Sequence, residues 1–417
     1  QQRRKDVVWL ANGLDMLRDP SFDDPSGICR EQVYLFNAMR KLEKSNNSGR
    51  THGNWRSLEA EFGAPTALAF RDGMVAFWRR YSPPLVSEGA QINSMPFADP
   101  FGLTGLTVEA METPGLMASL APAEARVAFR YAMRELNGFP DWFPCLFAAH
   151  PQLVAEMLLV EIKFELGMSD SDTAFQYVVA RTHHARDWLA NALTQGILLL
   201  LNSHLPWRPQ VLKYLVDILQ ASTLSDGLIA TLAREQMVLG DPMHCALWAA
   251  AWTSVDPDPA IDAVEQHLSA LGDAAHCTEF TMAFVAYLLG NRRSNSCMRH
   301  AYRTPAVLKR LYLLVHQHVR ADEDIDRAGK GVFSPGLRDD AQDAREHLVQ
   351  LLQELPGRET FLALQSLSQE HPHADYRPWM ARQALARAQV DSERPAWSAI
   401  QVSEFAETYE RSPANHR

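Results

Sequence analysis

The 417-residue sequence predicts an all-α fold with essentially no sheet. Proline-led helix starts recur about every fifty residues, and apolar residues repeat with the helical period. No stretch alternates apolar and polar residues with β-branched enrichment, as a half-buried strand would. Helix starts at such a spacing indicate stacked helical units, which usually bind a partner or transmit a signal. We therefore expect an irregular HEAT-like helical repeat array, an α-solenoid, closed by a C-terminal helical cap.

Four of the expected helices begin with a proline that precedes an aliphatic run. Proline suits the first helical position, because its missing N–H would be unpaired there and its φ is already helical. The four starts are Pro151-Gln152-Leu153-Val154, Pro209-Gln210-Val211-Leu212, Pro259-Ala260-Ile261 and Pro305-Ala306-Val307-Leu308. Further helices are expected between these starts, at residues 173–201, 227–239, 244–252 and 278–289. Each repeat would then hold two or more antiparallel helices.

Apolar stripes predict which helix faces need a partner helix. One stripe follows i, i+4, i+7 and i+11 through Leu153, Met157, Val160 and Phe164. The other three stripes consist of Leu212, Leu215, Val216 and Leu219, of Leu308, Leu311, Tyr312, Val315 and Val319, and of Leu348, Leu351, Leu352 and Leu355. We expect all four stripes to pack against neighbouring helices.

Three segments are predicted along the chain. Residues 1–100 form an irregular N-terminal helical segment, with a polar loop at 44–54 and a proline-punctuated connection at 82–100. Residues 101–320 form the repeat array, and 321–417 form an acidic loop followed by a C-terminal helical segment. Neither end of the sequence resembles a finished terminus. We expect a piece of a longer protein, with proteolytic trimming as the alternative.

Composition excludes several classes of function. The net charge of −10 argues against a nucleic-acid-binding solenoid, which needs a basic face. Five scattered cysteines do not form a disulfide framework, which favours a cytoplasmic protein with reduced thiols. The longest aliphatic run, from Ile197 to Leu201, is far shorter than the roughly 20 apolar residues that cross a bilayer. We expect neither a membrane nor a nucleic acid as partner.

One acidic motif suggests metal chemistry. Asp339-Asp340-Ala341-Gln342-Asp343 matches the Asp-Asp-x-x-Asp motif with which all-α isoprenoid synthases hold Mg²⁺ against a diphosphate. The second metal-binding helix of those enzymes is missing, and acidic residues after Ser334-Pro335-Gly336 would also complement the positive end of a helix. An all-α metal-dependent enzyme using Asp339, Asp340 and Asp343 is therefore the alternative function. We predict no other catalytic, cofactor-binding or metal-binding residue.

Other candidate sites fail on spacing or geometry. Gly329-Lys330-Gly331 lacks the spacing of a phosphate-binding loop, and no strand precedes it. Cys297 and His300 would share a helical face, but the adjacent His276-Cys277 diverge by about 100° on a helix, which disfavours a zinc site. Cys145 lies among aromatic residues, so we expect it in the core.

Histidines and tryptophans give weaker indications. We interpret His183-His184 and His316-x-His318 as surface or groove histidines. Most tryptophans are expected to fill gaps between stacked units, while one or two line a concave binding face. The seven on or beside expected helices are Trp142, Trp188, Trp207, Trp248, Trp252, Trp379 and Trp397.

Two stretches carry a family resemblance when they are taken together. The first includes Gly102-Leu103-Thr104-Gly105-Leu106, Arg130-Tyr131-Ala132 and Glu135-Leu136-Asn137-Gly138-Phe139-Pro140. The second includes Phe333-Ser334-Pro335-Gly336-Leu337-Arg338, Leu355-Pro356-Gly357, Arg377-Pro378-Trp379-Met380 and Trp397-Ser398. Over residues 55–417 the chain resembles the long helical region downstream of the NTPase module in large bacterial NACHT-like (STAND-class) ATP-binding proteins, several of which serve in antiphage defence.

The resemblance implies a non-catalytic sensor or scaffold segment. Nucleotide binding and effector activity would then lie elsewhere in the full-length protein, which could oligomerise. Its partner would be another protein or its own upstream NTPase module, held for recognition or for autoinhibition. No catalytic residue carries over, because the family's phosphate-binding motif is absent from this sequence.

Overall fold

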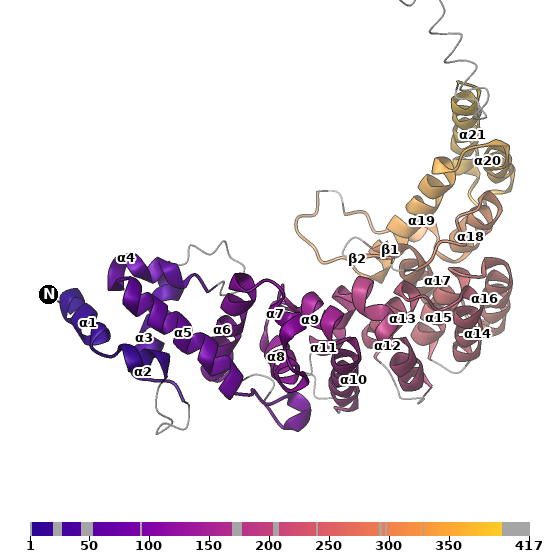
Figure 1. The fold of residues 1–417 in the computed structure, drawn as a ribbon. Coiled ribbons are helices and arrows are strands. Elements are labelled where there is room, and N and C mark those ends of the chain that lie inside the picture. The colour runs from indigo at the N-terminus through magenta and orange to yellow at the C-terminus, as the bar shows by residue number, and fades with distance from the viewer. Residues whose placement is uncertain are drawn as a thin grey trace, which may run out of the picture. The chain divides into compact units, whose positions relative to one another are not determined.

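The computed structural model contains helices almost throughout (Figure 1). The residues it describes are 2–19, 27–42, 53–91, 94–168, 177–202, 208–238, 241–291, 294–296, 298–327 and 329–393. Within these ranges the only strands are β1 (Gly290–Asn291) and β2 (Ser294–Asn295), an antiparallel pair with Gly290 opposite Asn295. The prediction of an all-α fold is confirmed.

The helices group into two compact units, residues 1–223 (unit 1) and 224–417 (unit 2). The segment boundaries predicted near residues 100 and 321 lie inside these units. Helix α5 packs on α6 across the first boundary, and α18 packs on α19 across the second. Each unit therefore has a core of its own.

Unit 1 contains the helices of the predicted N-terminal segment and those of the first part of the predicted array (Figure 1). Its helices are α1 (Gln2–Ala11), α2 (Leu14–Arg18), α3 (Arg30–Leu42), η1 (Trp55–Leu58), α4 (Glu59–Phe62), α5 (Ala64–Arg80), η2 (Val86–Glu88), α6 (Ala98–Glu112), α7 (Leu116–Ser119), α8 (Pro122–Arg134), α9 (Phe143–Ala149), α10 (Pro151–Gly167), α11 (Tyr177–His184), α12 (Arg186–Leu201) and α13 (Pro209–Ala221).

The core near the start of unit 1 forms where α5 and α6 cross. Phe70, Met74 and Phe77 of α5 are buried beside Phe101 of α6. The two helices approach closely because Gly105 lacks a side chain: a Cβ there would lie 2.1 Å from the carbonyl oxygen of Met74. This crossing fixes α6, and with it the end of the connection that lines the groove described below.

Unit 2 continues the series of helices and contains the strand pair (Figure 1). Its helices are α14 (Asp226–Met237), α15 (Pro242–Thr253), α16 (Pro257–Leu271), α17 (Ala274–Leu289), α18 (Pro305–His318), η3 (Ala321–Glu323), α19 (Leu337–Glu354), α20 (Arg358–Glu370), η4 (Ala374–Tyr376) and α21 (Arg377–Glu393).

Helix α15 is the centre of the core of unit 2. Its residues from Cys245 to Thr253 are all buried, and it packs against α14, α16 and α17. A helix that is apolar all round is expected to be enclosed on every side, as this one is. Asp241 caps its start by accepting hydrogen bonds from the N–H groups of Met243 and His244.

The proline-led starts are located almost as predicted. Helices α10, α13 and α18 begin at Pro151, Pro209 and Pro305. Helix α16 begins at Pro257, two residues before the predicted Pro259. Both prolines fit, because the first-turn N–H groups of a helix have no partner within it.

The other helix predictions are confirmed with shifted ends. The helix expected over 173–201 is divided at Ala185 into α11 and α12, and residues 173–176 lie outside the described ranges. The stripes on α13 and α18 are buried, as are Leu348, Leu351 and Leu352 on α19. The polar loop at 44–54 is described only from residue 53 onward.

Within the described ranges, no single helix has the length and the apolar composition needed to cross a membrane. Helices α9 and α10 meet both criteria only as a pair, which bends by 118° at its junction.

Candidate functional site

An open groove of about 1050 Å³ lies in unit 1, between α8, α10 and the segment around η2. Its lining is mainly apolar, with contributions from Leu85, Met157, Val160 and Phe164. Such a groove, with a few charged groups at its edge, is typical of a site that receives side chains of a ligand or partner.

Helix α10 supplies the apolar floor of this groove because it has two apolar faces. One face, with Val154, Leu158 and Ile162, is completely buried in unit 1. The other face is the stripe predicted to pack on a partner helix, but Val160 is 57% exposed and Phe164 is 39% exposed. The predicted packing of this stripe is therefore wrong. The core takes the neighbouring face, and Met157, Val160 and Phe164 of the predicted stripe line the groove instead.

Helix α8 presents a row of arginines, Arg126, Arg130 and Arg134, which share one face at i, i+4 and i+8. Arg134 is buried: its Nε donates to Oδ2 of Asp99 at 2.6 Å, and its Nη2 donates to the carbonyl oxygen of Ser94 at 2.5 Å. This buried pair holds the start of α6 against α8.

The connection between α5 and α6 forms one wall of the groove and is held to both other walls. Arg130 donates to both carboxylate oxygens of Glu88 and to the carbonyl oxygen of Pro83, the latter at 3.2 Å. These hydrogen bonds lower the pKa of Glu88. On the other side, the hydroxyl and the N–H of Ser87 both donate to the buried carboxylate of Glu161 on α10. The wall is therefore fixed at two points.

The charge that faces the groove is positive. Its two lining carboxylates, Glu88 and Glu161, are engaged as described above. Arg126 and Lys163 are exposed at its edge and have no hydrogen-bond or ion-pair partner among the described residues. Two unpaired cations beside an apolar floor favour a ligand that carries both apolar and acidic groups.

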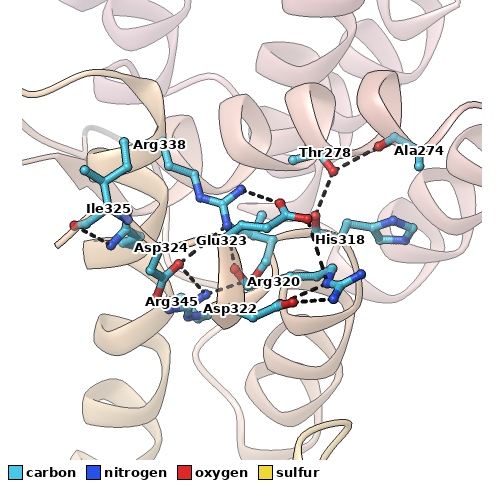
Figure 2. A network of polar contacts seen from close by, with 12 residues as sticks. Ala274, Thr278, His318, Arg320, Asp322, Glu323, Asp324, Ile325, Arg338 and Arg345 are labelled. Atoms are coloured by element: carbon cyan, nitrogen blue, oxygen red, sulfur yellow. Dashed lines mark hydrogen bonds and ion pairs between the residues drawn. The ribbon is translucent and has the colours of Figure 1, made fainter.

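The acidic loop after α18 is held to the helices of unit 2 by arginines, as Figure 2 shows. The paired side chains are Asp322 with Arg320, Glu323 with Arg338, and Asp324 with Arg345. The end of α18 is fixed as well, because the hydroxyl of Thr278 donates to the carbonyl oxygen of His318 at 2.9 Å. The acidic loop, predicted as the boundary between the repeat array and the C-terminal helical segment, is thus held to α19.

The Asp339-Asp340-x-x-Asp343 motif begins α19, and Asp339 already has partners. Arg327 donates to both of its oxygens at 2.9 and 3.0 Å, and the N–H of Gly336 donates at 2.8 Å. This is the helix-start role that the sequence offered as an alternative. In the described part of the chain, no three His, Cys, Asp or Glu side chains are placed to hold a metal ion.

The structure distributes the other candidate residues among ordinary roles. Cys297 lies outside the described residues, and Cys277 is buried with its thiol donating to the carbonyl oxygen of Leu268. Gly329 and Gly331 have φ values of 71° and 78°, as a turn requires. Cys145 is exposed, which contradicts its predicted place in the core.

The exposure of Cys145 follows from the orientation of α9. That helix turns Phe143 and Leu146 inward and carries Cys145 on its other side. The prediction of surface or groove histidines holds for two of the residues and fails for a third. His184 is exposed and His316 lines a cavity, but His183 is buried, with its Nε2 at 2.8 Å from Oδ2 of Asp217. A histidine within an apolar helix face is a signal that could have shown this.

Sequence reasoning missed Arg126 and Lys163 as site residues. No sequence motif marks either residue. Each matters because it lies beside an uncovered apolar face and has no partner among the described residues. The one usable signal was α10 itself, since Val154, Met157, Leu158 and Val160 cannot all face one neighbouring helix.

Comparisons of the chain with models of protein families, with characterised proteins and with solved structures give no match. We therefore infer the ligand of the groove from the side chains that line it.

Proposed function

We propose that this chain is a non-catalytic recognition segment whose groove in unit 1 binds an amphipathic, acidic helix of a protein partner. The observation that carries this proposal is the uncovered apolar face of α10, where Val160 and Phe164 are exposed on the groove floor. Apolar anchors at i, i+3 or i+4 spacing are the usual way in which a helix occupies such a groove.

The positive charges at the edge of the groove favour an acidic helix over a basic one. Arg126 and Lys163 would face carboxylates on the flanks of the bound helix, whereas a basic helix would be repelled. The wall formed by residues around η2 is already fixed by Arg130 and Ser87, so binding requires little ordering of the groove. A groove formed in advance loses less entropy on binding.

We further propose that this segment acts in the cytoplasm, as a sensor or scaffold arm of a larger STAND-type NTPase, as some antiphage defence proteins would use it. The resemblance of residues 102–106, 135–140 and 333–338 to that class supports this placement, and the all-α fold agrees with it. The partner would then be a foreign protein or the upstream NTPase module. A Walker A motif encoded upstream of this segment would agree with the proposal, and its absence would contradict it.

Binding of a synthetic peptide tests the groove directly. The probe is a fluorescein-labelled amphipathic helix with leucines at i, i+3, i+4 and i+7 and glutamates on its flanks. Fluorescence anisotropy measures its binding to the chain. We expect saturable binding that weakens at least about tenfold in Val160→Asp, because a charge then replaces an apolar anchor point. The matched control is Leu199→Asp on α12, where the side chain is 74% exposed outside the groove.

A charge exchange tests the selection of acidic ligands. In the double variant Arg126→Glu and Lys163→Glu, we expect preference to shift toward a peptide with lysines in place of the glutamates. The proposal would be overturned if Val160→Asp bound as tightly as Leu199→Asp, or if both peptides bound equally to the unmodified chain.

A further inference from the structure

A second cavity, of about 520 Å³, lies within unit 2 between α18, α19, η4 and α21. Three aromatic side chains line it, those of Tyr312, Tyr376 and Trp379. Two carboxylates, Glu346 and Asp375, lie on the same lining. Aromatic faces together with carboxylates are the surroundings that bind organic cations.

The aromatic lining is held in place by a buried histidine. Tyr376 stacks on the ring of His371 with centroids 4.9 Å apart and planes at 4°. The hydroxyl of Tyr312 lies 2.8 Å from Nε2 of the same ring. His371 is completely buried, so it fixes the positions of both tyrosines before any ligand arrives.

His316 contributes a buried polar atom without a partner. The residue is 3% exposed and lines the cavity, and its Nδ1 has no hydrogen-bond partner among the residues that the structure describes. Burial, with a smaller effect of the nearby Arg345, lowers the pKa of His316 to about 2, so its ring is neutral. A neutral imidazole has one nitrogen that accepts a hydrogen bond, which the N–H of a ligand can supply.

Arg345 is the only lysine or arginine on the described lining, and its charge is balanced outside the cavity. Its guanidinium donates to both carboxylate oxygens of Asp324 (Figure 2). It also donates to the carbonyl oxygen of Val319 at 2.9 Å. By contrast, Glu346 and Asp375 have no hydrogen-bond or ion-pair partner among the described residues. The charge left to face a ligand is therefore negative.

We propose that this cavity binds an alkylammonium group carried on an apolar stem, with Trp379 and Tyr376 against the cation and its stem. Glu346 and Asp375 are exposed residues of the lining and attract the charge, while His316 accepts a hydrogen bond from the ammonium N–H. The ammonium comes either from a free polyamine or from a lysine side chain. This site is separate from the groove in unit 1 and does not depend on it.

Isothermal titration of the full chain with two cations tests the proposal and separates the two sources. The probes are spermidine and the N-acetyl methylamide of lysine. The matched neutral ligand is the same lysine derivative acetylated on Nε, which removes the charge. We expect saturable binding of at least one cation and none of the neutral ligand. Binding of spermidine alone assigns a polyamine, and binding of the lysine derivative alone assigns a protein side chain.

Three variants connect that binding to the cavity. Trp379→Ala should weaken it about tenfold, because an aromatic face against a cation is lost. Glu346→Gln should weaken it about threefold, because the carboxylate is exposed and screened by water. Glu354→Gln is the control: it removes another exposed carboxylate from the same helix, outside the cavity lining.

The proposal is overturned if neither cation binds saturably at millimolar concentration, or if the neutral ligand binds as well as the lysine derivative. It is also overturned if Glu354→Gln weakens binding as much as Glu346→Gln, since general attraction to an acidic protein would then explain the heat. Should Trp379→Ala unfold, the double variant Glu346→Gln and Asp375→Asn decides, because both side chains are exposed.

Discussion

The groove of unit 1 and the cavity of unit 2 are both lined by apolar side chains, but opposite charges face them. Each lining contains acidic and basic side chains. In the groove both acids are engaged, Glu88 by Arg130 and Glu161 by the neutral Ser87, and in the cavity the one arginine of the described lining pairs with Asp324 outside it. Among the described residues this leaves Arg126 and Lys163 unpaired in the groove, and Glu346 and Asp375 unpaired in the cavity. The character of a site is therefore set by the ionised groups that remain unpaired, whatever the net charge of −10 suggests.

The two regions also differ in how deeply their supporting ion pairs are buried. Beneath the groove, Asp99 is completely buried with Arg134 at 7% exposure. The acidic loop beside the cavity includes pairs at the surface, such as Asp322 with Arg320, in which both side chains are more than half exposed. Breaking a buried pair leaves an uncompensated charge in the core, whereas a surface charge returns to water.

The largest effect on stability is expected when the buried ion pair between Asp99 and Arg134 is broken. Asp99→Ala should lower the free energy of unfolding of unit 1 by about 3–5 kcal/mol, because Arg134 is left charged and buried. Asp322→Ala in unit 2 should change stability little, since its partner Arg320 is exposed. Urea unfolding of both variants, with hydrogen exchange to assign each unit, measures the difference. Equal losses in the two variants would contradict this account.

An intermediate effect concerns pH. Burial lowers the pKa of His316 to about 2 and that of His371 to about 4, against about 6.5 in an unfolded chain. Between those values the unfolded chain binds more protons, so unit 2 loses stability as the pH falls below about 6.5, by roughly 1.4 kcal/mol per pH unit for each ring.

In unit 1, the groove wall that contains Glu88 should respond at lower pH. Hydrogen bonds from Arg130 lower the pKa of Glu88 from its usual 4.5, so the stability it contributes is lost only as the pH falls below that value. Hydrogen exchange at pH 7 and pH 5, corrected for intrinsic rates, should show α18 opening before α6. His316→Phe should reduce the pH dependence of α18. Earlier opening of α6 would contradict the assignment.

The smallest expected effect is an absence of heat when Mg²⁺ and pyrophosphate are titrated into the chain. Arg327 already bonds both oxygens of Asp339, which leaves that carboxylate little capacity for a metal ion. Saturable binding that disappears in Asp343→Asn would instead support the all-α metal-dependent enzyme.

Tryptophan positions show how far sequence reasoning extended. Trp142, Trp248 and Trp252 are buried, as expected of residues that fill gaps between helices. Trp379 lines the cavity of unit 2, and one or two tryptophans were expected on a concave face. The sequence could not distinguish Trp379 from the other tryptophans as a lining residue, because four separate elements form the lining. Trp207 and Trp397 lie outside the described residues.

By itself, the sequence determined the all-α fold class, three of the four proline-led helix starts and the buried faces of α13 and α18. These features depend on the backbone geometry of proline and on periodicity within one helix, both of which are local. Only the tertiary structure decided that Val160 and Phe164 stay uncovered, that Arg126 and Lys163 have no partner among the described residues, and that Trp379 and Glu346 line one cavity. Those outcomes depend on which helix covers which face, and the sequence of a single helix does not specify the helices that pack against it.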